Sequence, residues 1–312
     1  MLPRLCCLAL GVLALGAIAS AADVAPVRKR VLVFTKSSGF EHEAIKPVLK
    51  DGRPGYGFPV LDELGRKLDI DFVFSKDGWR FTPQYLAQFD AFFFYTTGDL
   101  TVAKSDPRGD GLPPMTPEGK AAFLAAIAGG KGFIGVHSAT DTFHSGGHNE
   151  HGPERWINDG AAADDFVQMI GGEFIRHGKQ QVAKLTVADP KFPGLSAVPA
   201  GLALMEEWYS LKNFAPDMHV LLVQETAGME GEEYQRPAYP STWVRLHGKG
   251  RVFYSSLGHR EDIWTNPVFQ EILAGGLNWA LGRVDADVTP NLATAAPGAN
   301  QLPVYVPPSK SP

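Results

Sequence analysis

Residues Gly132 to Ala139 have the sequence GFIGVHSA, an apolar run that ends at His137. A short apolar run bounded by glycines is typical of a strand buried in a parallel sheet. The small residues on both sides of His137 are typical of the sharp turn after a strand at which enzymes present a nucleophile. We therefore expect a central strand that carries an imidazole at its carboxyl end.

Strands and helices alternate around this stretch. Further buried strands are predicted at 31–35, 70–74 and 91–95, and a helix with three-to-four spacing of apolar residues at 58–68. Thr116, Pro117 and Gly129 mark the cap, the first turn and the end of a helix over 117–128. A further helix is expected from about Ala162 to Ile170. This alternation predicts one doubly wound α/β domain.

Shorter strands with alternating polarity are predicted from about Gln181 onward, and some of them should pair antiparallel. They are expected at 181–187, 202–208, 219–224, 241–246 and 251–256, before a last helix that begins at Pro267. The fold class is therefore a mostly parallel sheet with added antiparallel strands. Residues 283–312, which are rich in proline, are predicted to form an extended or disordered tail.

The amino-terminal segment is predicted to be a secretory signal peptide, residues 1–22. Arg4 precedes an apolar run over 5–18, and small residues follow at Ala19 and Ala21. This indicates a secreted or periplasmic protein, although an uncleaved anchor is the alternative. The two cysteines, Cys6 and Cys7, both lie in this segment. After cleavage the chain has no cysteine for a disulfide, a zinc site or a thiolate nucleophile.

The composition favours a globular protein with a small-molecule partner. Hydrophobic residues make up 44% of the chain, which is enough for a sizeable core. Acidic residues outnumber basic ones by 34 to 29, and basic residues form no run. Binding to nucleic acid is therefore not expected, and neither is membrane insertion after the signal is removed.

Several ionisable residues follow the predicted strands. Ligands of open α/β sheets bind beyond the carboxyl ends of the strands, so these side chains are candidates for one site. The alternative for each is a helix cap or a turn. The candidates are His42, Asp99, His137, Asp141 and His259.

Three further groups are less specific. Ser138 beside a histidine is an alternative nucleophile, and His144, His148 and His151 are spaced as a possible transition-metal cluster or a solvated loop. Glu207 and Trp208 suit a sugar, because a carboxylate accepts hydroxyl hydrogen bonds and an indole covers a ring face. A tryptophan in the core is the alternative.

Six short motifs occur in the order in which they are found in ThuA-like (trehalose-utilisation) proteins. The chain resembles that family over about residues 30–282, through 31–35 with 39–42, 96–99, 132–142, 207–209, 239–243 and 250–259. The resemblance implies a flavodoxin-like fold similar to class I glutamine amidotransferases, in which a cysteine normally occupies the position of His137. Without a cysteine in the mature chain, amidotransferase chemistry is excluded.

The resemblance also implies a role in the breakdown of carbohydrates, namely trehalose or related glycosides and their keto forms. On this basis His137, Asp141 and His259 are predicted to be catalytic. His42, Asp99, Glu207 and Trp208 are predicted to bind the sugar. A divalent metal held by histidines and Asp141 is a variant of the same hypothesis. The alternative is a sugar-binding or scaffold protein without catalysis.

Overall fold

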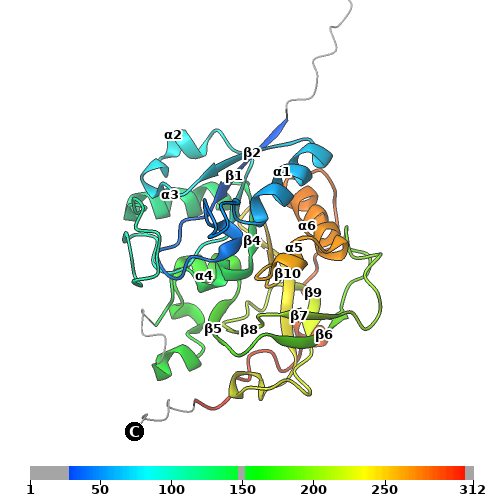
Figure 1. The fold of residues 1–312 in the computed structure, drawn as a ribbon. Coiled ribbons are helices and arrows are strands. Elements are labelled where there is room, and N and C mark those ends of the chain that lie inside the picture. Colours follow the sequence, from blue (N-terminus) through cyan, green and yellow to red (C-terminus); the bar gives the residue numbers. More distant parts are fainter. Residues whose placement is uncertain (1–27, 147–151, 306–312) are drawn as a thin grey trace, which may run out of the picture.

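A nine-stranded sheet forms the centre of the protein. The computed structural model describes residues 28–146 and 152–305 (Figure 1). The spatial order of the strands is β2-β1-β3-β4-β11-β10-β9-β6-β7. Their bounds, in that order, are Ile70–Ser75, Lys29–Phe34, Ala91–Phe94, Gly132–Val136, Gly250–Ser255, Tyr239–His247, His219–Gln224, Gln181–Val187 and Ala203–Glu206.

The first five strands in this order are all parallel, and the remaining pairs are antiparallel. The order β2-β1-β3-β4-β11 is the 2-1-3-4-5 order of flavodoxin-like folds. A second, two-stranded sheet joins β5 (Glu173–His177) to β8 (Tyr209–Lys212). The predicted fold class, a flavodoxin-like and mostly parallel sheet with added antiparallel strands, is confirmed.

Helices cover both faces of the sheet (Figure 1). Along β1, Val31 and Val33 belong to one core cluster, whereas Leu32 and Phe34 belong to the other. Strands buried on both faces need no alternation of polarity, which explains the continuous apolar runs in the sequence. On the Val31 side lie α1 (Gly57–Leu68) and α6 (Pro267–Ala280), and on the opposite side lie α2 (Pro83–Leu86), α3 (Pro117–Ala128) and α4 (Asp165–Ile170).

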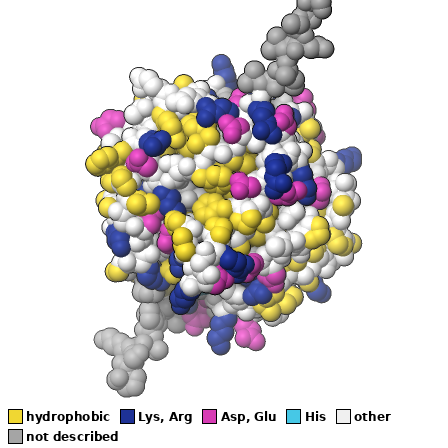
Figure 2. All heavy atoms as spheres, turned by 45° about the horizontal axis from the view of Figure 1, so that its top comes forward, with side chains coloured by type: hydrophobic (Ala, Val, Ile, Leu, Met, Phe, Trp, Pro, Cys, Tyr) yellow, Lys and Arg dark blue, Asp and Glu magenta, His cyan; other side chains and the backbone are white. Residues whose placement is uncertain are grey.

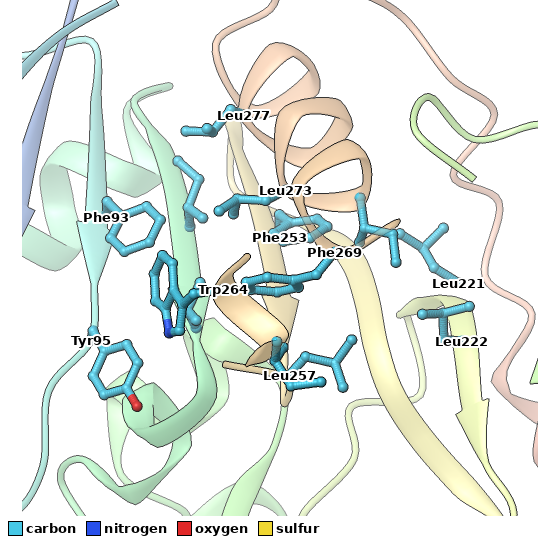
Figure 3. Close-up of a cluster of buried hydrophobic side chains, with 14 of the residues drawn as sticks. Phe93, Tyr95, Leu221, Leu222, Phe253, Leu257, Trp264, Phe269, Leu273 and Leu277 are labelled. Carbon is cyan, nitrogen blue, oxygen red and sulfur yellow. The ribbon is translucent and has the colours of Figure 1, made fainter. Parts of the chain in front are cut away.

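The core on the α6 side reaches the carboxyl ends of the strands. Figure 3 shows Trp264, from the short helix α5 (Glu261–Trp264), among Tyr95, Leu257 and Phe269. The Trp264 Nε1 donates a hydrogen bond to the Gly258 carbonyl oxygen (2.6 Å), and the Tyr95 hydroxyl donates to the same oxygen (3.2 Å). The buried aromatic side chains thus fix the turn that follows β11.

The boundaries predicted for α3 and β4 match the structure, whereas the strand predicted at 202–208 is shorter and ends before Glu207. β7 ends at Glu206 and pairs with β6, and β8 begins at Tyr209 and pairs with β5. Glu207 and Trp208 lie between these strands of different sheets. β5, which pairs with β8, was not expected from the sequence.

The segment after α6 follows the protein surface. Asn291 pairs with the backbone of Val220 in β9, and Leu292, in the short helix α7 (Leu292–Ala295), is buried. Within the described ranges, no helix has the length and apolar character needed to span a bilayer. The predicted signal peptide lies outside these ranges. On the face in Figure 2, side chains of both charges are interspersed with hydrophobic ones.

Candidate functional site

Three histidines meet beyond the carboxyl ends of central strands, and a glutamate joins them from the loop after the edge strand β7. They come from the loops after β1, β4, β7 and β11, and one ligand atom of each lies within 4.8 Å of every other. We call His42, His137, Glu207 and His259 the histidine–glutamate cluster. All four were predicted as site residues, and the structure brings them together because neighbouring loops converge at this edge of the sheet.

His137 occupies the sharp turn directly after β4. Its φ of 46° is in the left-handed region, which for a residue with a side chain costs about 1 kcal/mol or more. The Tyr254 hydroxyl donates a hydrogen bond to the His137 carbonyl oxygen (2.7 Å). The His137 Nδ1 lies 2.9 Å from the Ser256 carbonyl oxygen, so it carries the ring proton and donates. The lone pair of Nε2 therefore faces the cluster.

His42 is buried, and the Tyr209 hydroxyl orients its ring. Its Nε2 lies 3.4 Å from the Tyr209 hydroxyl, and its Nδ1 has no hydrogen-bond partner among the described residues. The ring centroid is 5.1 Å from that of His137 and 5.3 Å from that of His259. If Nε2 donates to the tyrosine oxygen, Nδ1 presents its lone pair to the same space as His137 Nε2.

His259 is held by the turn that precedes it. Gly258 has a φ of 116°, which favours glycine, and a Cβ at this position would lie 3.0 Å from Val136. The Glu206 carboxylate accepts hydrogen bonds from the backbone N–H groups of Gly258 (2.9 Å) and His259 (3.2 Å). Burial raises the pKa of Glu206 to about 7 despite these hydrogen bonds. Glu206 thus supports the turn, while its neighbour Glu207 enters the cluster.

Glu207 supplies the only carboxylate of the cluster. Its Oε2 lies 3.0 Å from His259 Nδ1 and 3.7 Å from His137 Nε2, and its Oε1 lies 3.6 Å from His177 Nδ1. Burial would raise the pKa of Glu207, but the contacts with His137 and His259 outweigh burial and hold this pKa well below its usual range. The carboxylate is therefore ionised.

The surroundings shift the pKa values of the three histidines in different directions. Burial, followed by the neighbouring His137 and His259, lowers the pKa of His42 well below its usual value. Burial also lowers the pKa of His137. Burial opposes the charged form of His259 as well, but the Glu207 carboxylate outweighs it and raises this pKa. Two neutral imidazoles and a carboxylate are the protonation states in which these groups bind a metal.

The ring nitrogens of the cluster fit a metal ion. Among the described residues, His42 Nδ1, His137 Nε2 and His259 Nδ1 are buried without a hydrogen bond, although His259 Nδ1 lies at ion-pair distance, 3.0 Å, from Glu207 Oε2. Buried polar atoms are rarely left unpaired in folded proteins. Three nitrogens and one carboxylate are a ligand set that zinc and related divalent metals accept.

A pocket of about 510 Å³ opens onto the cluster. His42, Glu207 and His259 lie in its wall, and His137 lies behind them with a side chain that is 0% exposed. The rest of the wall combines aromatic and charged side chains: Phe40, Arg108, Asp141, Phe174, Arg176, His177 and Tyr209, together with Ile175. A concave, partly apolar wall with a few polar groups is typical of a small-molecule site.

Two predicted sugar-binding residues lie elsewhere. Trp208 is fully buried in the core, where its Nε1 donates to the Gln181 carbonyl oxygen (2.9 Å), so it cannot cover a sugar ring. Neighbouring residues point in different directions, so Glu207 faces the pocket and Trp208 does not. Asp99 does not line the pocket, and its Oδ1 accepts hydrogen bonds from the backbone N–H (2.8 Å) and hydroxyl (2.6 Å) of Thr101. This is the turn-forming role that was its alternative.

Asp141 lines the pocket but is not one of the four ligands. Its Oδ1 contacts His144 Nε2, and His144 is buried rather than solvated. The metal hypothesis therefore changes: Glu207, not Asp141, is the carboxylate among the histidines. His148 and His151, the other members of the predicted histidine loop, lie outside the described residues. Ser138 is buried, and its hydroxyl has no hydrogen-bond partner among the described residues.

Several residues of the pocket wall were not predicted from the sequence. His177 and Arg176 lie at the end of β5, a strand that the sequence did not indicate. Phe40 and Tyr209 each lie two residues from a predicted site residue, within motifs that the analysis had already singled out. Proximity to His42 and Glu207 is the signal that could have found them.

Comparisons with known proteins place the chain in a family. The family model described as ThuA, trehalose utilisation, matches residues 30–280. A ThuA-like protein from Bacteroides uniformis has a similar fold, with a TM-score of 0.58 and 16% identity over 89% of this chain and all of that one.

A ThuA-like protein from Parabacteroides merdae gives a TM-score of 0.50 and 19% identity over 89% of this chain and 97% of that one. At these identities the two structures show the shared fold alone. No protein of curated function matches the chain. Since the family model spans most of its length, the chain belongs to the ThuA (trehalose utilisation) family.

Proposed function

We propose that this protein is an enzyme of carbohydrate breakdown that binds a divalent metal through His42, His137, Glu207 and His259. The observation that carries the proposal is the set of three buried ring nitrogens that, among the described residues, lack hydrogen bonds and lie around an ionised carboxylate. A structural cluster would pair these nitrogens with protein groups. A metal ion would satisfy all three at once, and it would lie at the floor of a pocket.

The wall of the pocket supports a sugar as the ligand. Phe40 is 37% exposed and can cover the C–H face of a ring, while Asp141 and Arg176 can bond to hydroxyl groups. The family description, trehalose utilisation, points to the same class of compound. Trehalose, related glycosides and their keto forms are the substrates we propose.

The metal would act as a Lewis acid on a carbonyl or hydroxyl oxygen of the sugar. His137 and His42 would hold it in a fixed position, because hydrogen bonds at their outer nitrogens fix the ring orientations. The sharp turn after β4 thus presents His137 as a metal ligand and not as a nucleophile. Such a site supports hydrolase, lyase or isomerase chemistry.

The test compares protein that has been stripped by a chelator with protein reloaded with Zn²⁺ or Mn²⁺. Both are incubated with trehalose and 3-ketotrehalose, and products are followed by mass spectrometry. We expect turnover only with metal, and loss of both metal and turnover in Glu207→Gln. Glu225→Gln is a matched control, because Glu225 accepts a hydrogen bond from Thr186 outside the pocket wall. Equal turnover of stripped and loaded protein would refute the proposal, whereas sugar binding without turnover would indicate a binding protein.

We also propose that the protein is secreted or periplasmic, because residues 1–22 have the charge and apolar pattern of a cleaved signal. Mass spectrometry of the protein from the native host should find a new amino terminus near Ala21 or Ala22. Recovery of the intact amino terminus from the cytoplasm would contradict this proposal.

A further inference from the structure

A second group of ionisable side chains adjoins the pocket. Asp141, His144 and Glu173 form a row in which each imidazole nitrogen faces a carboxylate oxygen. His144 Nε2 contacts Asp141 Oδ1, and His144 Nδ1 lies 3.1 Å from Glu173 Oε1. We call these three residues the carboxylate–histidine row. His144 and Glu173 are buried, with side chains 2% and 0% exposed, whereas Asp141 reaches the pocket wall.

The inner end of the row is fixed. Glu173 accepts hydrogen bonds from the backbone N–H of Ser145 (3.0 Å), the Ser145 hydroxyl (2.8 Å) and the Asn213 amide (2.7 Å). Burial opposes its charge, but His144 outweighs burial and, with Lys212 and Ser145, lowers the pKa of Glu173 to about 2. An ionised and fully bonded Glu173 cannot move without breaking several contacts, so it orients His144.

Cationic side chains lie beside the row. Both ring nitrogens of His144 face carboxylate oxygens, which only accept hydrogen bonds. Arg155 Nη1 lies 2.8 Å from the ring nitrogens and 3.9 Å from Asp141 Oδ1. Lys212, whose Nζ lies 3.7 Å from Glu173 Oε2, pairs with Asp159 at 2.7 Å. The Asp141, Glu173 and Asp159 carboxylates thus lie near the cations of Arg155 and Lys212.

The outer end of the row has one free oxygen. Asp141 Oδ1 is engaged by His144, whereas Oδ2 has no hydrogen-bond partner among the described residues, and the side chain is 18% exposed. Among the residues of the pocket wall, Asp141 and Glu207 are the two carboxylates. Glu207 belongs to the histidine–glutamate cluster. Asp141 is therefore the carboxylate that is oriented toward the pocket without being needed by the metal.

We propose that Asp141 is a catalytic residue that takes a proton from the bound sugar, and that His144 and Glu173 are positioning residues for it. The inference rests on the proposed function, because it requires a sugar carbonyl held at the cluster. Asp141 Oδ2 would remove the proton from the carbon next to that carbonyl. The C–H electron pair would form a C=C bond, and the carbonyl electrons would move to the oxygen, whose negative charge a divalent metal held by the histidine–glutamate cluster would stabilise. The proton remains on Asp141 and returns when the enolate collapses.

The experiment measures exchange of carbon-bound hydrogen for deuterium in 3-ketotrehalose, in D₂O, with Zn²⁺-loaded protein. We expect Asp141→Asn to lose at least about 100-fold of the exchange rate, within the range of general acid–base catalysis, while its affinity for Zn²⁺ is unchanged. We expect the exchange rate of His144→Gln to fall by about 10-fold, through a lower kcat and not a higher KM. Asp99→Asn is the matched control, because this aspartate also follows a central strand but lies outside the pocket wall.

A structural role is separated from catalysis by chemical rescue. Added formate should restore exchange in Asp141→Gly, because the small carboxylate can occupy the vacated position, and it should not change the control variant. Failure of Zn²⁺ to bind would defeat the proposed function. Normal Zn²⁺ binding with full exchange in Asp141→Asn, or with no exchange in the unchanged protein, would overturn this inference alone.

Discussion

Two clusters of histidines and carboxylates lie side by side in this protein, and they differ in how their ring nitrogens are used. In the histidine–glutamate cluster, three buried nitrogens face one another without hydrogen bonds. In the carboxylate–histidine row, both nitrogens of His144 face a carboxylate, and Glu173 accepts three further hydrogen bonds. Both groups combine imidazoles with carboxylates. The hydrogen bonds of the ring nitrogens are incomplete in the cluster, whereas in the row each ring nitrogen has a carboxylate partner.

This difference separates binding from orientation. Ring nitrogens without hydrogen-bond partners can be satisfied by a cation. Ring nitrogens that already face carboxylates instead fix the orientation of the side chains. Changing one cluster and measuring both metal affinity and the stability of the metal-free protein tests the contrast. In metal-free protein, each change should affect mainly the property of its own cluster.

The largest effect is expected for His137→Ala. Loss of one ligand nitrogen at the buried centre of the cluster should weaken Zn²⁺ binding by more than about 100-fold, beyond the 10- to 100-fold typical of outer partners. Isothermal titration calorimetry on chelator-stripped protein measures this. His144→Gln is the matched control and should bind Zn²⁺ as the unchanged protein does. If both histidine variants lost the metal equally, the contrast between the clusters would be wrong.

Glu173→Gln should destabilise the fold without changing metal affinity. Removing one partner of a buried charge network typically costs about 3 kcal/mol or more. The pKa of Glu173 is lowered in the folded state, so its contribution is present above the usual pKa of a glutamate, near 4.5, and is lost as pH falls toward 2. Urea unfolding between pH 6 and pH 3 measures both effects. The variant should show a shallower fall in stability than the unchanged protein, and an equal fall would contradict the assignment.

Metal binding itself should raise the thermal stability. At a free Zn²⁺ concentration of 100 times Kd, linkage predicts about 2.7 kcal/mol, which for a domain of this size is roughly a 5–10 °C rise in Tm. Differential scanning calorimetry with and without a chelator measures the rise. His259→Ala should lack it. A rise that persisted in this variant would indicate a metal site elsewhere.

The smallest effect is expected for Tyr209→Phe. The tyrosine hydroxyl lies 3.4 Å from His42 Nε2 and orients a ligand without touching the metal. Loss of such an outer partner should weaken Zn²⁺ binding by about 10-fold. Tyr85→Phe removes a hydroxyl in α2, outside the pocket wall, and serves as the comparison. Equal affinities of both variants would remove Tyr209 from the ligand-orienting set.

The sequence could predict the elements whose signals are local. The apolar run before His137 and the cap formed by Thr116 and Pro117 each lie within a few residues, and both elements occur where they were expected. The convergence of His42, His137 and His259 could also be predicted from the sequence, because each follows a parallel strand and the carboxyl ends of such strands lie at one edge of the sheet.

Contacts between distant segments could not be predicted. Glu173 meets His144 only because β5 pairs with β8, and no periodicity in the sequence indicates that pairing. Whether Glu207 or Trp208 faces the pocket depends on how the chain turns between two sheets. Asp99 follows a central strand like the others, but it bonds to its own turn. Position after a strand therefore identified candidates without identifying their partners.

X-ray absorption at the zinc edge tests the central claim most directly. Protein loaded with one equivalent of Zn²⁺ should show three imidazole nitrogens and a carboxylate oxygen at about 2.0–2.2 Å, and the imidazole signal should fall in His137→Ala. A first shell made of water oxygens, or a spectrum that this variant leaves unchanged, would contradict a metal centre at the floor of the pocket.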